Sequence, residues 1–267
     1  AIIDGPRNSI ENAFTGTLTT GSGNWSYSAG TRYDENTIFI RGNDELMLRL
    51  QQEFNLMWAN SRDFIWDDAL EWLGSKEISD YMIPDTQVLD AAFTSANFKT
   101  SVTTYGPTFS VVSGRNNVSD RLVELIQNAR KSIHIASGHL RSRPIAEAIM
   151  ERWAENPDLD IRIYLDGQEC ISDWYQNEQE SELRDCIEAA GDSVSKIQKC
   201  MDKGYYFSYE IQDAGIALRF KYYCYRWDYH YAEQMHHKYL IFDGQVLASG
   251  SYNLSDNAEH NTMENVV

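Results

Sequence analysis

With 267 residues, of which 42% are apolar and 24% charged, the chain is long enough to bury the core of one large domain or of two lobes. Its formal net charge of −17 argues against a broad basic surface for duplex DNA, because an acidic protein repels a polyanion. No apolar run approaches the ~20 residues that span a bilayer, so any membrane contact is expected to be peripheral.

The N-terminal region contains one clear amphipathic pattern. Residues 44–60 place apolar side chains mostly at helical spacing and predict a helix. We expect the aromatic side chains of this helix, Phe54 and Trp58, to lie in the core. The pattern weakens after residue 62, and a Tyr-Gly-Pro turn follows at residues 105–107. Residues 63–112 are therefore interpreted as a connection between two lobes.

Helical and strand patterns then alternate along the chain. An amphipathic helix capped at Ser119 is followed by a buried strand from Ser132. A second helix carries Pro144 in its first turn, and a second strand starts at Asp160. This order predicts an α/β layer with some parallel strand pairing.

Residues 168–215 interrupt this alternation and are interpreted as an insertion with two helices. The apolar segment from Gly215 is expected to return to the sheet. Residues 238–244 and 245–251 predict two short strands joined by a turn at Asp243-Gly244.

The cysteines fall within one acidic part of the chain. Residues 151–200 hold 13 acidic side chains against 5 basic ones. None of the cysteines has the C-x-x-C spacing of a zinc site, so two disulfides or buried free thiols remain open. Disulfides favour an exported protein, secreted or periplasmic. The four residues are Cys170, Cys186, Cys200 and Cys224.

An internal repeat relates the two ends of the chain. The sequence GSYNLSDNAEHNTMEN at residues 250–265 aligns without gaps with GSGNWSYSAGTRYDEN at residues 21–36. In both copies a Glu-Asn pair begins 14 residues after the leading Gly. A shared Asp-Gly extends the repeat upstream, with ten extra residues after Asp4. Such a repeat predicts two copies of one supersecondary unit.

The complete copy has the spacing His236-x-Lys238-x4-Asp243-x6-Gly250-Ser251-x-Asn253, followed by Glu264. This pattern resembles the HKD motif of the phospholipase D superfamily. The resemblance implies a bilobal α/β fold of mixed sheets flanked by helices, with the active site at a pseudo-two-fold interface between the lobes. It assigns residues 1–62 to the C-terminal part of a first lobe and residues 113–267 to a second, complete lobe.

Elementary chemistry explains the residue types. An imidazole such as His236 can take a phosphoryl group and surrender it to water. Lys238 and Asn253 can neutralise the charge of a phosphodiester in the transition state. A carboxylate behind the imidazole fixes its tautomer, and Glu264 is the candidate. The resemblance gives Asp243 a more structural role.

The shorter copy is expected to complete the site. Ser251, Ser22, Asn24 and Glu35 are the candidate substrate-binding residues. The resemblance implies a reaction that needs no cofactor or metal, and the spacing of the histidines fits no familiar metal site. His237 is expected on the opposite face of the strand from His236.

The first copy lacks its own H-x-K within this sequence. If Asp4 is the Asp of a first motif, its Lys lies two residues before Ala1 and its His four before. We therefore expect an N-terminal segment or a second chain to supply the other histidine, and little activity from this chain alone.

The expected function is that of a phospholipase D-like phosphodiesterase, which hydrolyses or transfers phospholipid head groups through a phosphohistidine. The absence of a basic surface favours lipid over nucleic acid as the substrate. One alternative is an HKD-type nuclease that acts on single-stranded nucleic acid. Another is a non-catalytic phosphate-binding module, because the first motif is incomplete.

Overall fold

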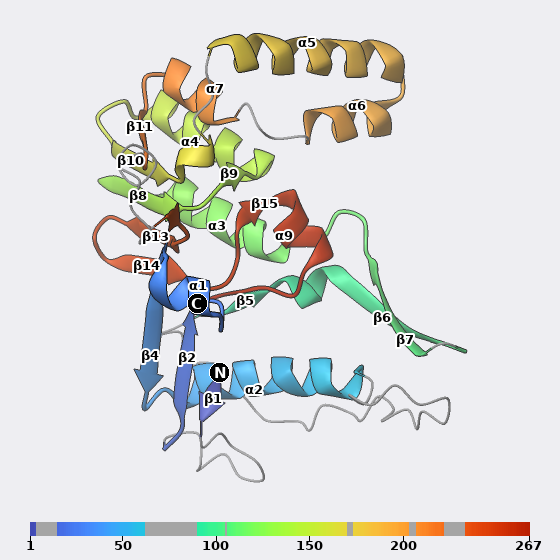
Figure 1. Ribbon diagram of the computed structural model, residues 1–267, viewed down its shortest axis with the longest axis vertical. Helices are drawn as coiled ribbons and strands as arrows, with labels where there is room; N and C mark the ends of the chain where they lie inside the picture. Colours follow the sequence, from blue (N-terminus) through green and yellow to red (C-terminus); the bar gives the residue numbers. More distant parts are fainter. Residues whose placement is uncertain (4–14, 62–89, 105, 170–172, 203–206, 222–232) are drawn as a thin grey trace.

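The computed structural model describes residues 1–3, 15–61, 90–104, 106–169, 173–202, 207–221 and 233–267. It has two lobes that meet near the chain termini (Figure 1). The first lobe contains a three-stranded antiparallel sheet with the order β1-β2-β4, which comprises β1 (Ile2–Ile3), β2 (Thr17–Gly21) and β4 (Thr37–Arg41).

Helix α2 (Asp44–Ala59) packs against this small sheet and confirms the predicted helix. Its start is fixed by the Asn43 side chain, which accepts a hydrogen bond from the Leu46 amide at 2.8 Å. Phe54 and Trp58 stack on each other but are 48% and 61% exposed, so the expectation that they lie in the core is wrong. The core of this lobe is instead formed by Leu18, Leu46, Met47 and Leu48.

The predicted connection contains regular structure. It includes β5 (Ala92–Phe93), the 3-10 helix η2 (Thr94–Asn97) and a hairpin of β6 (Phe98–Thr103) with β7 (Gly106–Val111). The hairpin projects away from both lobes (Figure 1). Residues 62–89 of the predicted connection lie outside the described residues.

The second lobe is built on a five-stranded mixed sheet with the order β11-β10-β8-β13-β14. Strands β8, β10 and β11 are parallel, and β13 pairs antiparallel with both β8 and β14. The α/β fold class and the parallel pairing are therefore confirmed. The strands are β8 (Ser132–Ser137), β10 (Asp160–Leu165), β11 (Ala217–Phe220), β13 (Lys238–Phe242) and β14 (Val246–Ser249).

Three helices cover this sheet, namely α3 (Asn117–Asn128), α4 (Arg143–Glu155) and α7 (Phe207–Asp213). Helix α3 starts two residues earlier than predicted, and its cap comes from elsewhere in the fold. The buried Glu259 of α9 (Asp256–Asn261) accepts hydrogen bonds from the amides of Val118 and Ser119 at 3.1 and 3.0 Å. This carboxylate satisfies amides that the first turn leaves without helical partners.

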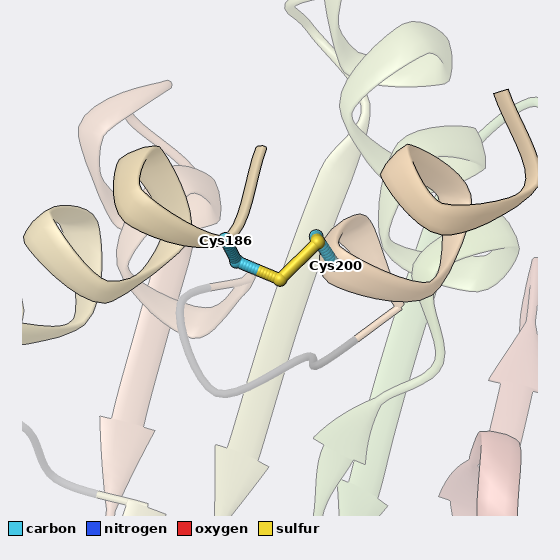
Figure 2. The surroundings of a disulfide bond; sticks show 2 residues. All are labelled: Cys186 and Cys200. Atoms are coloured by element: carbon cyan, nitrogen blue, oxygen red, sulfur yellow. A yellow bond between two sulfur atoms is a disulfide. The ribbon is translucent and has the colours of Figure 1, made fainter. Parts of the chain in front are cut away.

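The insertion contains α5 (Asp173–Ala190) and α6 (Val194–Met201), with α7 as a third helix that was not predicted separately. A disulfide between Cys186 and Cys200 joins α5 to α6 (Figure 2). Cys170 and Cys224 lie outside the described residues.

Removing the disulfide is expected to destabilise the protein. It closes a loop with a sequence separation of 14, and a loop of about 15 residues corresponds to about 3 kcal/mol of lost chain entropy in the unfolded state. The double variant Cys186→Ala/Cys200→Ala should therefore lose about that free energy of unfolding in urea titrations. Equal stability of the variant and the oxidised protein would contradict a structural role for this bond.

Candidate active site

The two copies of the repeat fold into matching turns. The Ser22 hydroxyl accepts a hydrogen bond from the Asn36 amide at 3.0 Å, and the Ser251 hydroxyl accepts one from the Asn265 amide at 3.1 Å. The Ser22 and Ser251 amides in turn donate to the carbonyls of the same two asparagines, both at 3.0 Å. The hydroxyls of both predicted substrate-binding serines thus hold the segment that contains the repeated Glu-Asn pair.

The glycine before each serine is required by this close approach. A Cβ on Gly21 would lie 2.1 Å from the carbonyl oxygen of Asn36, and a Cβ on Gly250 would lie 2.0 Å from that of Asn265. No side chain fits at such distances, which explains why the repeat begins with Gly in both copies.

Each repeated Asn is held by the start of a short helix. The carbonyl of Asn24 accepts from the Ser26 amide at 2.8 Å, and the carbonyl of Asn253 accepts from the Ser255 amide at 2.7 Å. Ser26 caps α1 (Tyr27–Thr31), and Ser255 caps α9 in the same way. The amide side chains of Asn24 and Asn253 therefore leave equivalent points of the two lobes.

The upstream part of the repeat also matches. Strand β1 pairs with β2 through Ile2↔Leu18, and β13 pairs with β14 through Ile241↔Leu247. These are the pairs that the sequence repeat makes equivalent once its ten extra residues are placed before β2. Asp4 itself lies outside the described residues.

Two asparagines join the lobes across the interface. Asn36 of the first lobe donates to the Ser249 hydroxyl at 2.8 Å, and Asn265 of the second accepts from the Thr20 hydroxyl at 2.7 Å. Thr20 and Ser249 are themselves equivalent positions of the repeat, so the two bonds are related by the pseudo-two-fold axis. No role was predicted from the sequence for these asparagines, although both follow the repeated Glu.

His236 lies at the interface between the lobes. The short strand β12 (Gln234–Met235) pairs in parallel with β3 (Tyr33–Asp34) of the first lobe, and the His236 amide donates to the Asp34 carbonyl at 2.9 Å. This pairing places the His236 Nδ1 atom 2.8 Å from the Glu35 Oε1 atom. The carboxylate behind the imidazole is thus Glu35, and the prediction of Glu264 in that position is wrong.

Glu264 occupies the equivalent position in the other lobe. Its carboxylate accepts from the Thr262 hydroxyl at 2.8 Å, and its amide donates to the Thr94 hydroxyl at 2.8 Å. Spacing along the chain makes Glu35 and Glu264 equivalent, so Glu264 was expected beside His236, the histidine of its own lobe. In the fold, the glutamate of the first lobe contacts the histidine of the second lobe instead.

The contact with Glu35 sets the chemistry of the imidazole. A carboxylate can only accept a hydrogen bond, so Nδ1 of His236 carries a proton and Nε2 is left for the reaction. The Lys238 ammonium lies 3.0 Å from Nε2 and 3.1 Å from Nδ1, on the same face of the chain. The predicted pairing of His236 and Lys238 is therefore present in the structure.

Lys238 is a buried lysine. Its side chain is 5% exposed, and burial lowers the pKa of Lys238 from 10.5 to about 8, against the opposing charges of Glu35 and Glu264. Because one pKa unit corresponds to about 1.4 kcal/mol, the charged form costs about 3 kcal/mol of folding free energy at neutral pH. Such a cost is typical of a site that is preorganised for an anion.

The pH dependence of stability should report this cost. Between about pH 8 and 10.5 the unfolded chain keeps a proton on Lys238 that the folded chain releases, so the free energy of unfolding rises with pH in this window. Lys238→Met removes this contribution and should flatten the rise. Urea titrations of both proteins at about pH 7 and about pH 10 measure the difference. Parallel pH profiles would contradict the lowered pKa.

Two of the predicted site residues carry a side-chain oxygen that has no hydrogen-bond partner among the described residues. The two oxygens are Oδ1 of Asn253 and Oε2 of Glu35, and both are buried. Buried polar atoms are normally hydrogen-bonded, so these two indicate a place for a bound group or water. Asn24, the equivalent of Asn253, lies at an exposed position.

Asp243 has a structural position, as the resemblance implied. Its carboxylate accepts from the amides of Arg130, Lys131 and Ser132 at 2.7–3.1 Å. Although desolvation raises its pKa, these backbone hydrogen bonds hold the pKa of Asp243 below its usual value. The residue therefore anchors the end of β13 to the start of β8.

Two buried charges near His236 were not predicted. Lys221, with a fully buried side chain, donates to Asp34 at 2.7 Å and so ties the residue before Glu35 to the second lobe. Asp166 accepts from the Met235 amide at 2.6 Å and holds the residue before His236. Lys221 and Asp34 are 187 residues apart, and nothing in the local sequence links them.

The described residues hold no group of three or more His, Cys, Asp or Glu side chains that could bind a metal ion. His230 lies outside those residues. Among the helices that the structure describes, none is both long and apolar enough to cross a membrane.

Comparison with known proteins identifies the family. The model of the family described as "Cardiolipin synthase, PLD-like domain" matches residues 122–267, which is more than half of the chain. The chain therefore belongs to this family of PLD-like domains, within the phospholipase D superfamily of phosphodiesterases. No curated protein matches the sequence.

Solved structures with a similar fold include three members of this superfamily. Nuc from Salmonella typhimurium is 19% identical over 58% of this chain and 76% of its own, with a TM-score of 0.36. NucT from Helicobacter pylori is 18% identical over 63% and 83%, with a TM-score of 0.35. Phosphatidylserine synthase from Haemophilus influenzae Rd KW20 is 12% identical over 94% and 54%, with a TM-score of 0.47.

Proposed function

We propose that this protein is a phospholipase D-type phosphodiesterase that hydrolyses or transfers phospholipid head groups. The observation that carries the proposal is the cluster of Glu35, His236 and Lys238 at the lobe interface. Asn253 of the same motif adds a buried side-chain oxygen that has no partner among the described residues. A nucleophile, a cation and an amide are the groups that phosphoryl transfer through a phosphohistidine requires.

The reaction proceeds in two displacements at phosphorus. In the first, a histidine Nε2 forms a bond to phosphorus, the ester P–O bond breaks, and a second histidine gives its proton to the leaving oxygen. In the second, water or an alcohol forms the new P–O bond, the P–N bond breaks, and the second histidine takes the proton of the incoming oxygen. His236 takes one of these two roles, and both use Nε2 while Glu35 holds Nδ1.

The second histidine is proposed to come from outside residues 1–267, from an upstream segment or from a second chain. Leu254 is 1% exposed because β15 (Leu254–Ser255) pairs with β9 (Leu140–Arg141), whereas its equivalent Trp25 is 90% exposed. Within the described residues β1 pairs only with β2, whereas its equivalent β13 pairs on both edges. The first lobe thus offers a strand edge and an apolar surface to such a partner.

Charge favours a lipid over a nucleic acid. A single-stranded polynucleotide needs a basic groove that follows several phosphates. Here the buried cation Lys238 is influenced by the charges of Glu35 and Glu264, in a protein of net charge −17. Another buried lysine, Lys221, is paired with Asp34. This arrangement suits one phosphate better than a chain of them, and the description of the matching family also names a lipid enzyme. We also propose export, secreted or periplasmic, on the strength of the disulfide.

The test compares substrates under matched conditions. Phosphatidylcholine and phosphatidylglycerol vesicles and single-stranded DNA are incubated with EDTA and without it. The chain is assayed alone and together with the proposed upstream segment. We expect turnover of a phospholipid at a rate that EDTA does not change. This turnover should occur only when the second histidine is present. Cleavage of DNA alone would establish the nuclease instead, and tungstate binding without turnover of either substrate would establish the non-catalytic module.

A further inference from the structure

The segment that follows β8 runs along the site. In the β8–β13 ladder Ser137 lies opposite Lys238, and beyond the ladder the Gly138 amide still donates to the His237 carbonyl at 3.2 Å. The segment after β8 and the segment before β13 therefore remain adjacent. Continued by two residues, this register places His139 opposite His236.

The other side of the same segment faces Asn253. Strand β9 pairs in parallel with β15 through Leu140↔Leu254. Stepping back one residue along both strands places His139 beside Asn253. Figure 1 shows β9 between β8 and β15. The two registers together therefore put His139 next to His236, two residues before β13, on one side and next to Asn253, directly before β15, on the other.

The approach to His236 is close. A Cβ built on Gly138 would lie 4.0 Å from Cδ2 of His236 and 3.3 Å from the Met235 carbonyl oxygen. A methyl group at residue 138 would therefore be in ordinary van der Waals contact with the imidazole that the mechanism uses.

The His139 imidazole is held by a buried carboxylate. Nδ1 lies 3.0 Å from Oε1 of Glu169, whose side chain is 2% exposed, and Arg141 donates to both oxygens of the same carboxylate. Burial raises the pKa of Glu169, but these hydrogen bonds outweigh it and hold that pKa below its usual value. Glu169 is therefore ionised and accepts from Nδ1, which leaves Nε2 for another partner.

We propose that His139 is a substrate-contacting residue whose Nε2 donates a hydrogen bond to the phosphodiester held by His236, Lys238 and Asn253. The inference rests on the proposed function and adds a residue to the site. The ring holds Glu169 through Nδ1, and Nε2 on its other edge is the nitrogen that can serve as a second donor. No hydrogen bond within the described part of the chain occupies Nε2 of His139.

The test uses tungstate as a phosphate analogue and measures its affinity by calorimetry. His139→Gln keeps a donor for Glu169 but loses the ring nitrogen Nε2. It should weaken tungstate binding roughly tenfold to a hundredfold, as expected for one hydrogen bond to a charged group. The matched control is His134→Gln in β8, the strand that precedes His139, where His134 contacts Asp160 at 3.0 Å in another His–carboxylate pair. That variant should bind tungstate within about twofold of the native chain.

The outcomes separate this inference from the proposed function. Tungstate binding that is lost in Lys238→Met but unchanged in His139→Gln would overturn the role of His139. The same result would still support a phosphate site at Lys238. No binding to the native chain would overturn both. If His139→Gln does not fold, the native protein is modified with diethyl pyrocarbonate with and without tungstate, and its peptides are fragmented by mass spectrometry. Tungstate should protect His139 and not His134, and equal modification of His139 in both samples would contradict the proposal.

Discussion

Replacing His236 with asparagine is expected to lower phosphodiester turnover by roughly 10²–10⁴-fold or more, without loss of the fold. Asparagine fills similar space and can still donate to Glu35, but it offers neither a nucleophile nor an acid at the position of Nε2. Turnover of bis-p-nitrophenyl phosphate, in the assembly that supplies the second histidine, measures the effect. Circular dichroism checks the fold.

The neighbouring histidine serves as the control for this change. His237 contacts Asn36 at 3.4 Å instead of Glu35, and its ring packs near Tyr239. His237→Asn should keep turnover within about threefold of the native value, the range of an ordinary substitution away from the reacting groups. More than a tenth of native activity in His236→Asn would remove His236 from the reaction.

The second large effect is expected from Glu35→Gln. Glutamine keeps the shape of the side chain, but its NH2 group can donate to Nδ1 and so favour the tautomer that carries the proton on Nε2. An analogous Asp→Asn change in a Ser-His-Asp triad costs about 10⁴-fold in kcat, so we expect roughly 10²–10⁴-fold here, with little change in KM. If Glu35 had only a structural role, Glu35→Gln would lower the stability of the protein and leave the kcat of the folded fraction near native.

Glu53, another partly buried glutamate of the first lobe, provides the comparison. Glu53 accepts from the Ser95 hydroxyl at 2.7 Å, and burial raises the pKa of Glu53 despite that hydrogen bond. Glu53→Gln should therefore leave kcat within about threefold of native. If Glu35→Gln and Glu53→Gln behaved alike, the contact between Glu35 and His236 would have no part in the reaction.

The fold could be predicted where it depends on local pattern. The repeat correctly predicted which residues of β1 and β2 are equivalent to which residues of β13 and β14. Matched spacing in the two copies forces matched turns around Gly21 and Gly250. Alternation of strand and helix predicted the parallel part of the second sheet. The buried face of α2 was predicted less well, because helical periodicity identifies an apolar face but not what covers it.

The site was predicted in its residue types and only partly in its contacts. Glu35 and His236 are 201 residues apart and meet through the pairing of β3 with β12, two strands of two residues each. Spacing within each repeat cannot show that the carboxylates are exchanged between the lobes. Lys221 and His139 were missed for the same reason, since their partners come from distant segments and neither belongs to the repeated motif.

The central claim is that the two lobes build one oxyanion site around His236, and a crystal structure with bound tungstate tests it most directly. Anomalous scattering from tungsten locates the ion without ambiguity. The account predicts one tungstate between His236 Nε2, Lys238 Nζ and the Asn253 side chain, with Glu35 still in contact with Nδ1. Tungstate bound elsewhere while this position stays empty, or tungstate held without any contact to His236 and Lys238, would contradict it.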